Sequence, residues 1–194
     1  MSLSALMAPG VRILGLNALL GRDAAHYATY SQISTPAGAA LDFTYAGAAP
    51  PTGGNAVSIL PYLTNRISET DATGAREVVS GPFTGCVMTI FRRDGLSHVG
   101  HVDTNPATSQ RTAYASWKSN SRYQIVNELD TTGLLSANKG EGCIVCIADG
   151  DTIVAAVMKV SIYNYHATVT FIGGEKGRGM KSETMYEVLR VESH

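Results

Sequence analysis

The chain has 194 residues, of which 44% are hydrophobic and 16% are charged. This composition indicates one globular domain over residues 1–194 with a sizeable core, and it excludes a disordered tail. The formal net charge of -1 argues against a nucleic-acid binder that uses a broad basic face. No apolar run is long and uninterrupted enough to cross a bilayer, so we predict no membrane span.

The chain contains three cysteines, Cys86, Cys143 and Cys146. An odd number does not fit a secreted disulfide framework, so we expect reduced thiols in a cytosol-like compartment. The first ten residues carry no positive charge and do not match a standard signal peptide. We therefore expect a soluble protein, and the sequence leaves open whether it is secreted or delivered into the cytosol of a host cell.

The N-terminal part is predicted to be poor in strands. Residues 1–30 are rich in Ala and Leu and lean towards helix. Residues 35–55 are rich in Ala, Gly and Pro, and we interpret them as a surface loop with one short strand at 41–45. We expect this helical and loop part, 1–55, to belong to the same domain as the rest of the chain.

The remainder of the chain is predicted to be rich in strands. Apolar, β-leaning runs predict strands at 56–60, 86–91, 96–104, 142–147, 152–163, 168–172 and 185–191. Asp94-Gly95 predicts a hairpin turn between the second and third of these strands. One helix is expected at 108–117, with Thr108 or Ser109 near its N-cap. Together these patterns indicate a β-rich core with a few helices packed outside.

The most informative local feature joins a cysteine at the start of one predicted strand to histidines on the next. It consists of Gly81-Pro-Phe-Thr-Gly-Cys86 followed by His98-Val-Gly-His101-Val-Asp103. A thiol must lose its proton to become a nucleophile, and a nearby imidazole can accept that proton and hold an ion pair. Gly85 leaves room for a substrate backbone beside the sulfur, and backbone N–H groups at the bend could face an oxyanion.

The sequence pattern leaves the identity of the partner histidine open. His98 and His101 are three residues apart, so they face opposite sides of a regular strand. Val99 and Asp103 share a face with His101, but the register of the hairpin is not fixed by the pattern. A simpler interpretation is that Cys86 is a small buried hydrophobe and that both histidines are structural.

These residues resemble a known enzyme family. Phe83-Thr-Gly-Cys86 is similar to the Leu-Ser-Gly-Cys motif of the glutamine deamidase toxins, which include cytotoxic necrotizing factor and Burkholderia lethal factor. His101-Val-Asp103 is similar to the His-Ile-Asp segment of the lethal factor, which favours His101. The 15-residue step from the cysteine to His101 suits the necrotizing factor, whereas the lethal factor spacing would select His98. The resemblance covers roughly residues 56–120.

The resemblance implies a single α/β domain with a central β-sandwich of mixed sheets flanked by helices. It also implies a cysteine hydrolase that converts a protein glutamine to glutamate, with Cys86 as nucleophile and His101 as base. The third element of the family is a backbone carbonyl that orients the histidine, and this element maps to Ser80. If an amine replaced the attacking water, the same site would act as a transglutaminase.

Binding residues are expected around this pair, namely Thr84, Gly85 and Asp103. Asp103 could also orient His101 from the same strand face. Phe83 and Thr84 depart from the Leu and Ser of the family motif, which affects the substrate more than the chemistry. The expected partner is a protein with a target glutamine, such as a host GTPase or translation factor. The enzyme is expected to be a monomer without cofactor or metal.

Other motifs and functions were weighed against this hypothesis. Cys143-Ile-Val-Cys146 has redox or metal spacing, but residues three apart in a strand face opposite sides, so we expect a structural role. Residues 174–182 lack the Gly-Lys-Ser order of a phosphate loop, and we expect a flexible basic surface loop there. Two alternatives are a cysteine protease or other amidase with the same pair, and a binding module with a merely buried Cys86.

Overall fold

The computed structural model describes residues 1–36, 38–53, 55–72, 77–104, 110–136, 139–170, 174 and 176–194, with the backbone alone at 167–170. The elements, in chain order, are α1 (Leu3–Leu6), β1 (Arg12–Leu14), α2 (Leu16–Leu20), β2 (His26–Thr35), β3 (Gly38–Gly47), β4 (Ala56–Pro61), β5 (Ile67–Asp71), β6 (Val78–Phe83), β7 (Val87–Arg93), β8 (Leu96–Val102), α3 (Gln110–Ser119), β9 (Tyr123–Asp130), β10 (Cys143–Asp149), β11 (Thr152–Thr170) and β12 (Lys176–Ser193).

The larger sheet closes into a barrel with the strand order β1-β12-β11-β10-β6-β4-β2-β3. The sheet is mixed, as predicted, because β1 pairs with β3 and β4 pairs with β6 in parallel while the other neighbours are antiparallel. All eight strands send buried apolar side chains into the barrel, where they meet residues of α1 and α2. Removal of this apolar surface from water is the main force that closes the barrel.

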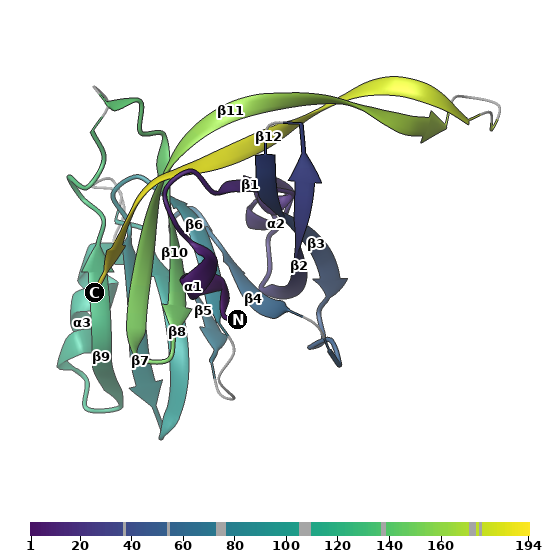
Figure 1. Ribbon diagram of the computed structural model, residues 1–194. Helices are drawn as coiled ribbons and strands as arrows, with labels where there is room; N and C mark the ends of the chain where they lie inside the picture. The colour runs from purple at the N-terminus through teal and green to yellow at the C-terminus, as the bar shows by residue number, and fades with distance from the viewer. Residues whose placement is uncertain are drawn as a thin grey trace.

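Strand β10 shows how one strand serves two cores. Cys143 and Val145 contribute to the core inside the barrel, whereas Ile144 and Cys146 contribute to a second core outside it. This division follows from the alternation of side chains along a strand. The second core joins the outer face of the barrel to the four-stranded sheet β5-β8-β7-β9. The two sheets face each other, which confirms the predicted sandwich, and α3 lies against the second sheet (Figure 1).

The hairpin that carries the predicted site forms as expected. Strands β7 and β8 pair in antiparallel register and turn at Asp94 and Gly95, whose φ angles are 52° and 82°. Two successive positive φ values are typical of the tight turn that matches the twist of a hairpin. The predicted helix after the hairpin also forms, with bounds shifted to those of α3, while Thr108 and Ser109 lie outside the described residues.

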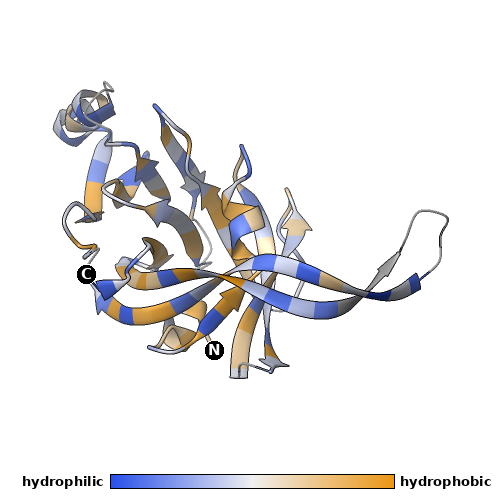
Figure 2. Ribbon diagram, turned by 90° about the horizontal axis from the view of Figure 1, so that it is seen from above, coloured by the Kyte–Doolittle hydropathy of each residue, from blue (hydrophilic) through white to orange (hydrophobic). Residues whose placement is uncertain are grey.

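Strands β11 and β12 form a long hairpin that extends past the barrel as an arm (Figure 1). Polar and apolar residues alternate along the arm when it is seen from above (Figure 2). The predicted basic loop at 174–182 is wrong for Lys176–Ser182, which belong to β12, because cross-strand pairing with β11 outweighs the local preference of the glycines. The predicted strand at 168–172 is the end of β11, and its residues 171–172 lie outside the described part.

The helix-leaning prediction for residues 1–30 is largely wrong. Only two short helices form there, and the segment also contains β1 and the start of β2. Isolated helices of this length are marginal in water, whereas β1 gains partners on both sides, in β3 and β12. The short strand predicted at 41–45 lies within the longer β3. Among the described residues, no helix has the length and hydrophobicity that a membrane crossing requires.

Candidate active site

The bend between β6 and β7 places Cys86 in an open cleft. The side chain of Cys86 is half-buried and lines a cavity of about 510 Å³. Thr84, Gly85 and Asp103, which the sequence predicted as binding residues, line the same cavity. The other lining residues are Tyr62, Pro82, Thr104, Arg111 and Thr132. A cleft of this size can accommodate the side chain of a substrate residue.

The register of the hairpin shows which histidine shares a face with Cys86. Met88 of β7 lies opposite His101 of β8, and residues two apart in a strand share a face. Cys86 packs against the same apolar cluster as Met88, between the second sheet and the barrel. His98 lies opposite Phe91 on the other face, where Phe91 also contacts Trp117 of α3. The structure therefore brings His101, and not His98, to the face of Cys86.

His101 is buried beside the cleft and is 1% exposed. Its ring stacks on Phe83, with ring centroids 3.9 Å apart, and lies 5.2 Å from the ring of Tyr62. Tyr62 lines the cleft together with Cys86. In the described residues, neither ring nitrogen of His101 is hydrogen-bonded to the thiol. Within the described residues, the two groups of the predicted pair therefore share a sheet face, and no hydrogen bond joins them.

The hydrogen bonds of Ser80 define the tautomer of His101. Ser80 Oγ lies 2.7 Å from the Leu60 carbonyl oxygen and 2.9 Å from His101 Nδ1. The carbonyl can only accept, so the single hydroxyl hydrogen is donated to Leu60, and the hydroxyl oxygen accepts from Nδ1–H. His101 Nε2 is then unprotonated, and this buried atom has no hydrogen-bond partner among the described residues. An oriented imidazole with a free basic nitrogen is what a general base requires.

Ser80 contacts His101, but through a different atom from the one that the resemblance implied. The resemblance implied a backbone carbonyl as the group that orients the histidine. The contact observed is made by the side-chain hydroxyl. The backbone of Ser80 lies in the middle of the barrel sheet, paired with Leu60 of β4 and Cys146 of β10. A carbonyl has no sequence signature, so the atom could not be chosen from the sequence.

The electrostatics of the site favour neutral forms of both groups. Burial lowers the pKa of His101 to about 3, with a smaller opposite effect from the Asp103 carboxylate. Burial also raises the pKa of Cys86, and Asp103 and Asp130 add to this effect. The backbone N–H of Thr104 acts in the opposite direction on the same pKa. A resting ion pair, which the sequence suggested, is therefore disfavoured relative to a neutral thiol beside a neutral imidazole.

Three threonines hold the bend at Gly85 and Cys86. Thr131 donates to the Cys86 carbonyl from its N–H at 3.0 Å and from its hydroxyl at 2.8 Å. The Gly85 carbonyl accepts from the hydroxyls of Thr132, at 3.2 Å, and Thr104. Gly85 has a φ of 147°, in the region that favours glycine. The bend that presents the thiol is therefore held by residues from two segments, the one that directly follows β9 and the one that directly follows β8.

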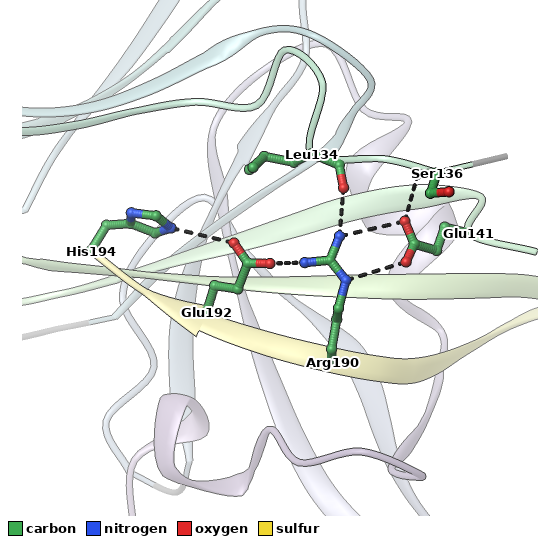
Figure 3. A network of polar contacts seen from close by, with 6 residues as sticks. All are labelled: Leu134, Ser136, Glu141, Arg190, Glu192 and His194. Carbon is green, nitrogen blue, oxygen red and sulfur yellow. Dashed lines mark hydrogen bonds and ion pairs between the residues drawn. The ribbon is translucent and has the colours of Figure 1, made fainter. Parts of the chain in front are cut away.

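The segment that follows β9 is itself anchored to the barrel (Figure 3). Arg190 of β12 donates to the Leu134 carbonyl and forms ion pairs with Glu141 and Glu192. Glu141 also accepts the backbone N–H of Ser136 at 2.6 Å. Because the threonines at the cleft stand at the start of this segment, the network links one rim of the cleft to the barrel.

Several lining residues were not predicted from the sequence. Tyr62 follows the end of β4 and Arg111 lies in the first turn of α3, and no motif distinguishes either of them. Thr104 could have been suspected because it follows the predicted Asp103. Within the described residues, no group of three or more His, Cys, Asp or Glu side chains is placed to hold a metal ion.

The other two cysteines have the structural role that was predicted. Cys143 and Cys146 are buried in β10 and belong to the two different cores. Burial raises the pKa of Cys143 to about 11 and also raises the pKa of Cys146. Their opposite orientations confirm that the Cys-x-x-Cys spacing does not form a joint site here.

A larger cavity of about 700 Å³ lies between the arm and the hairpin β2–β3. Its lining includes Asp42, Tyr163, Tyr165 and Glu183, but no cysteine and none of the predicted site residues. The smaller cleft at Cys86 is the better candidate for an active site because a thiol lines it and a buried imidazole lies on the same sheet face.

Comparisons with protein families and with curated proteins add no relative of this chain. No protein-family model matches it, and a search of curated proteins also finds no match. The resemblance to the glutamine deamidase toxins therefore stays a prediction, and the case for the site rests on its residues and their geometry.

Proposed function

We propose that this protein is a cysteine-dependent hydrolase that converts a glutamine of a partner protein to glutamate. One observation carries the proposal. An accessible thiol lines a cleft on the sheet face that also holds an imidazole with a fixed Nδ1–H and a free Nε2. A nucleophile, a base and a third group that orients the base form the general arrangement for covalent catalysis, here Cys86, His101 and Ser80.

In the proposed reaction, the sulfur of Cys86 attacks the carbon of the glutamine carboxamide while His101 Nε2 accepts the thiol proton. Both groups are neutral at rest, so charge separates only as the carbon–sulfur bond forms. The protonated His101 then donates to the departing ammonia, which leaves a thioester. Water attacks the thioester and releases glutamate and the free thiol. Contacts of this kind are often long in unliganded enzymes and shorten when substrate binds.

The choice of a glutamine side chain over a backbone amide rests on the similarity of residues 83–86 and 101–103 to the deamidase motifs. The open cleft supports a protein substrate, because the thiol stands at a bend between two strands and not at the bottom of an enclosed cavity. Specificity for one target protein would come from the residues around the cleft.

A cell lysate provides the direct test without a known substrate. The lysate is incubated with wild-type protein, Cys86→Ser or His98→Asn, and glutamine-to-glutamate conversion is measured by peptide mass spectrometry. We expect conversion at defined glutamines with the wild type and with His98→Asn, and none with Cys86→Ser. New chain termini would instead identify a protease, and the absence of any Cys86-dependent change would contradict the proposed hydrolase.

A further inference from the structure

We propose that Arg111 forms a carboxylate-binding subsite beside Cys86, so that the enzyme selects glutamines with an Asp or Glu neighbour. The identity of the substrate rests on the function proposed above. The anion subsite itself does not, because it follows from the arrangement of Arg111 in the cleft.

Arg111 occupies the junction of two hollows. It lines the cleft that contains Cys86, and it also lines an adjoining hollow of about 180 Å³ against α3 and β9. Thr104 lines both hollows as well, so they meet at these two residues. A polypeptide whose glutamine enters the cleft at Cys86 would therefore pass close to the guanidinium of Arg111.

One nitrogen of the Arg111 guanidinium is hydrogen-bonded within the protein, and its two terminal nitrogens have no partner among the described residues. Its Nε donates to the Thr104 carbonyl at 3.0 Å. Within the described part of the chain, its terminal nitrogens form no hydrogen bond or ion pair. An arginine held in this way keeps its two terminal donors available, and their planar arrangement matches a carboxylate.

Lys118, a second basic residue of the adjoining hollow, differs from Arg111 in its partners. It lines the adjoining hollow, two helical turns from Arg111 on the same face of α3, but its ammonium group is 3.1 Å from the Glu128 carboxylate. Lys118 is thus already in an ion pair, whereas Arg111 forms none with a described acidic side chain, although Asp103 lines the cleft and Asp130 lines the adjoining hollow. Arg111 also acts on the thiol, since its positive charge opposes the increase in the pKa of Cys86.

A pair of alkylating reagents tests the subsite without a substrate. Iodoacetate carries a carboxylate and iodoacetamide is a neutral amide, and both react with the same thiolate. The ratio of their rates at Cys86 is therefore independent of the pKa of the thiol. We expect Arg111→Gln to lower the iodoacetate-to-iodoacetamide ratio about threefold, the scale of an exposed ion pair. We expect Lys118→Gln to leave the ratio unchanged.

The two proposals fail in distinguishable ways. An unchanged ratio in Arg111→Gln, or an equal change in Lys118→Gln, would overturn the subsite whatever the lysate shows. In the lysate, the glutamines converted by the wild type should be enriched in Asp or Glu neighbours, and Arg111→Gln should remove that enrichment. Conversion without such enrichment would also overturn the subsite and leave the deamidase intact. If the wild type converts no glutamine in the lysate but Arg111→Gln lowers the alkylation ratio, the deamidase proposal is overturned and the subsite remains.

Discussion

His98 and His101 lie three residues apart in β8, yet they face different parts of the molecule. Both are buried, at 8% and 1% exposure, and both stack on a phenylalanine. His98 stacks on Phe91 on the α3 side of the second sheet. His101 faces the barrel and donates to Ser80 through Nδ1. Burial and stacking are therefore shared, and the strand face distinguishes the two residues.

The comparison shows what makes a histidine a candidate base. The side facing the barrel supplies a hydroxyl that fixes the tautomer of His101, and Nε2 has no partner in the part of the chain that the structure describes. The same side carries Cys86, because residues at the bend pack against the core between the two sheets. His98, on the other face, has neither feature. Loss of His98 and loss of His101 should therefore have different effects on activity.

The largest expected effect is on activity. His101→Asn should reduce the rate of glutamine conversion at least about 100-fold, because a positioned general base typically contributes that much or more. His98→Asn should change the rate less than about twofold. Conversion rates in lysate, measured on protein shown to be folded by circular dichroism, check this prediction. Loss of activity in His98→Asn with retention in His101→Asn would reverse the assignment.

The second expected effect is on acid stability. The unfolded imidazole binds a proton near pH 6.5, whereas burial keeps folded His101 neutral down to about pH 3, the value of its lowered pKa. The unfolded state therefore binds more protons in this window, and stability falls as pH falls through it. Between pH 7 and pH 4, the wild type should lose about 3 kcal/mol that His101→Asn does not lose.

Urea unfolding at several pH values measures this difference, and His98→Asn is the control. We expect His98→Asn to retain the wild-type decrease in the free energy of unfolding. A parallel decrease in wild type and His101→Asn would show that His101 is not the group responsible.

A smaller effect is expected for Ser80→Ala. The change removes the acceptor of His101 Nδ1–H and the donor to the Leu60 carbonyl, which should cost about 1–3 kcal/mol of stability. Activity should fall by up to about tenfold. This factor corresponds to about 1.4 kcal/mol, which is near the upper end of the net contribution of one hydrogen bond. The signals of the ring nitrogens in NMR spectra should show a loss of the single Nδ1–H tautomer. A preserved tautomer would show that Ser80 does not orient the ring.

Local sequence signals were sufficient for the hairpin that carries the site. Asp94 and Gly95 adopt positive φ values that few other residue pairs tolerate, so the position of the turn could be predicted from this dipeptide alone. The face of His101 could not be located in this way, because a shift of one residue in register would turn His98, and not His101, to the sheet face of the thiol. That choice depends on pairing between strands, which the sequence does not encode locally.

Tertiary pairing also explains the errors elsewhere. Residues 1–30 contain helix-favouring Ala and Leu, but β1 is held by β3 and β12 from distant parts of the chain. Lys176–Ser182 contain glycines typical of loops, yet β11 provides a continuous partner. At the site, Tyr62 and Arg111 approach Cys86 from segments that are far from it in sequence. The sequence motif therefore indicated Cys86 and the two histidines as candidates, whereas most of the residues around them could not be predicted from it.

The most direct test of the Cys86–His101 pair is the rate of Cys86 alkylation by iodoacetamide as a function of pH. It is measured in wild type, His98→Asn and His101→Asn. The raised pKa of Cys86 predicts that the rate rises towards a plateau above the pH of an ordinary thiol, whose pKa is about 8.5. Because His101 Nε2 is proposed to accept the thiol proton as the carbon–sulfur bond forms, we expect a severalfold lower rate at neutral pH in His101→Asn and an unchanged rate in His98→Asn. Equal rates in all three proteins would contradict the pair.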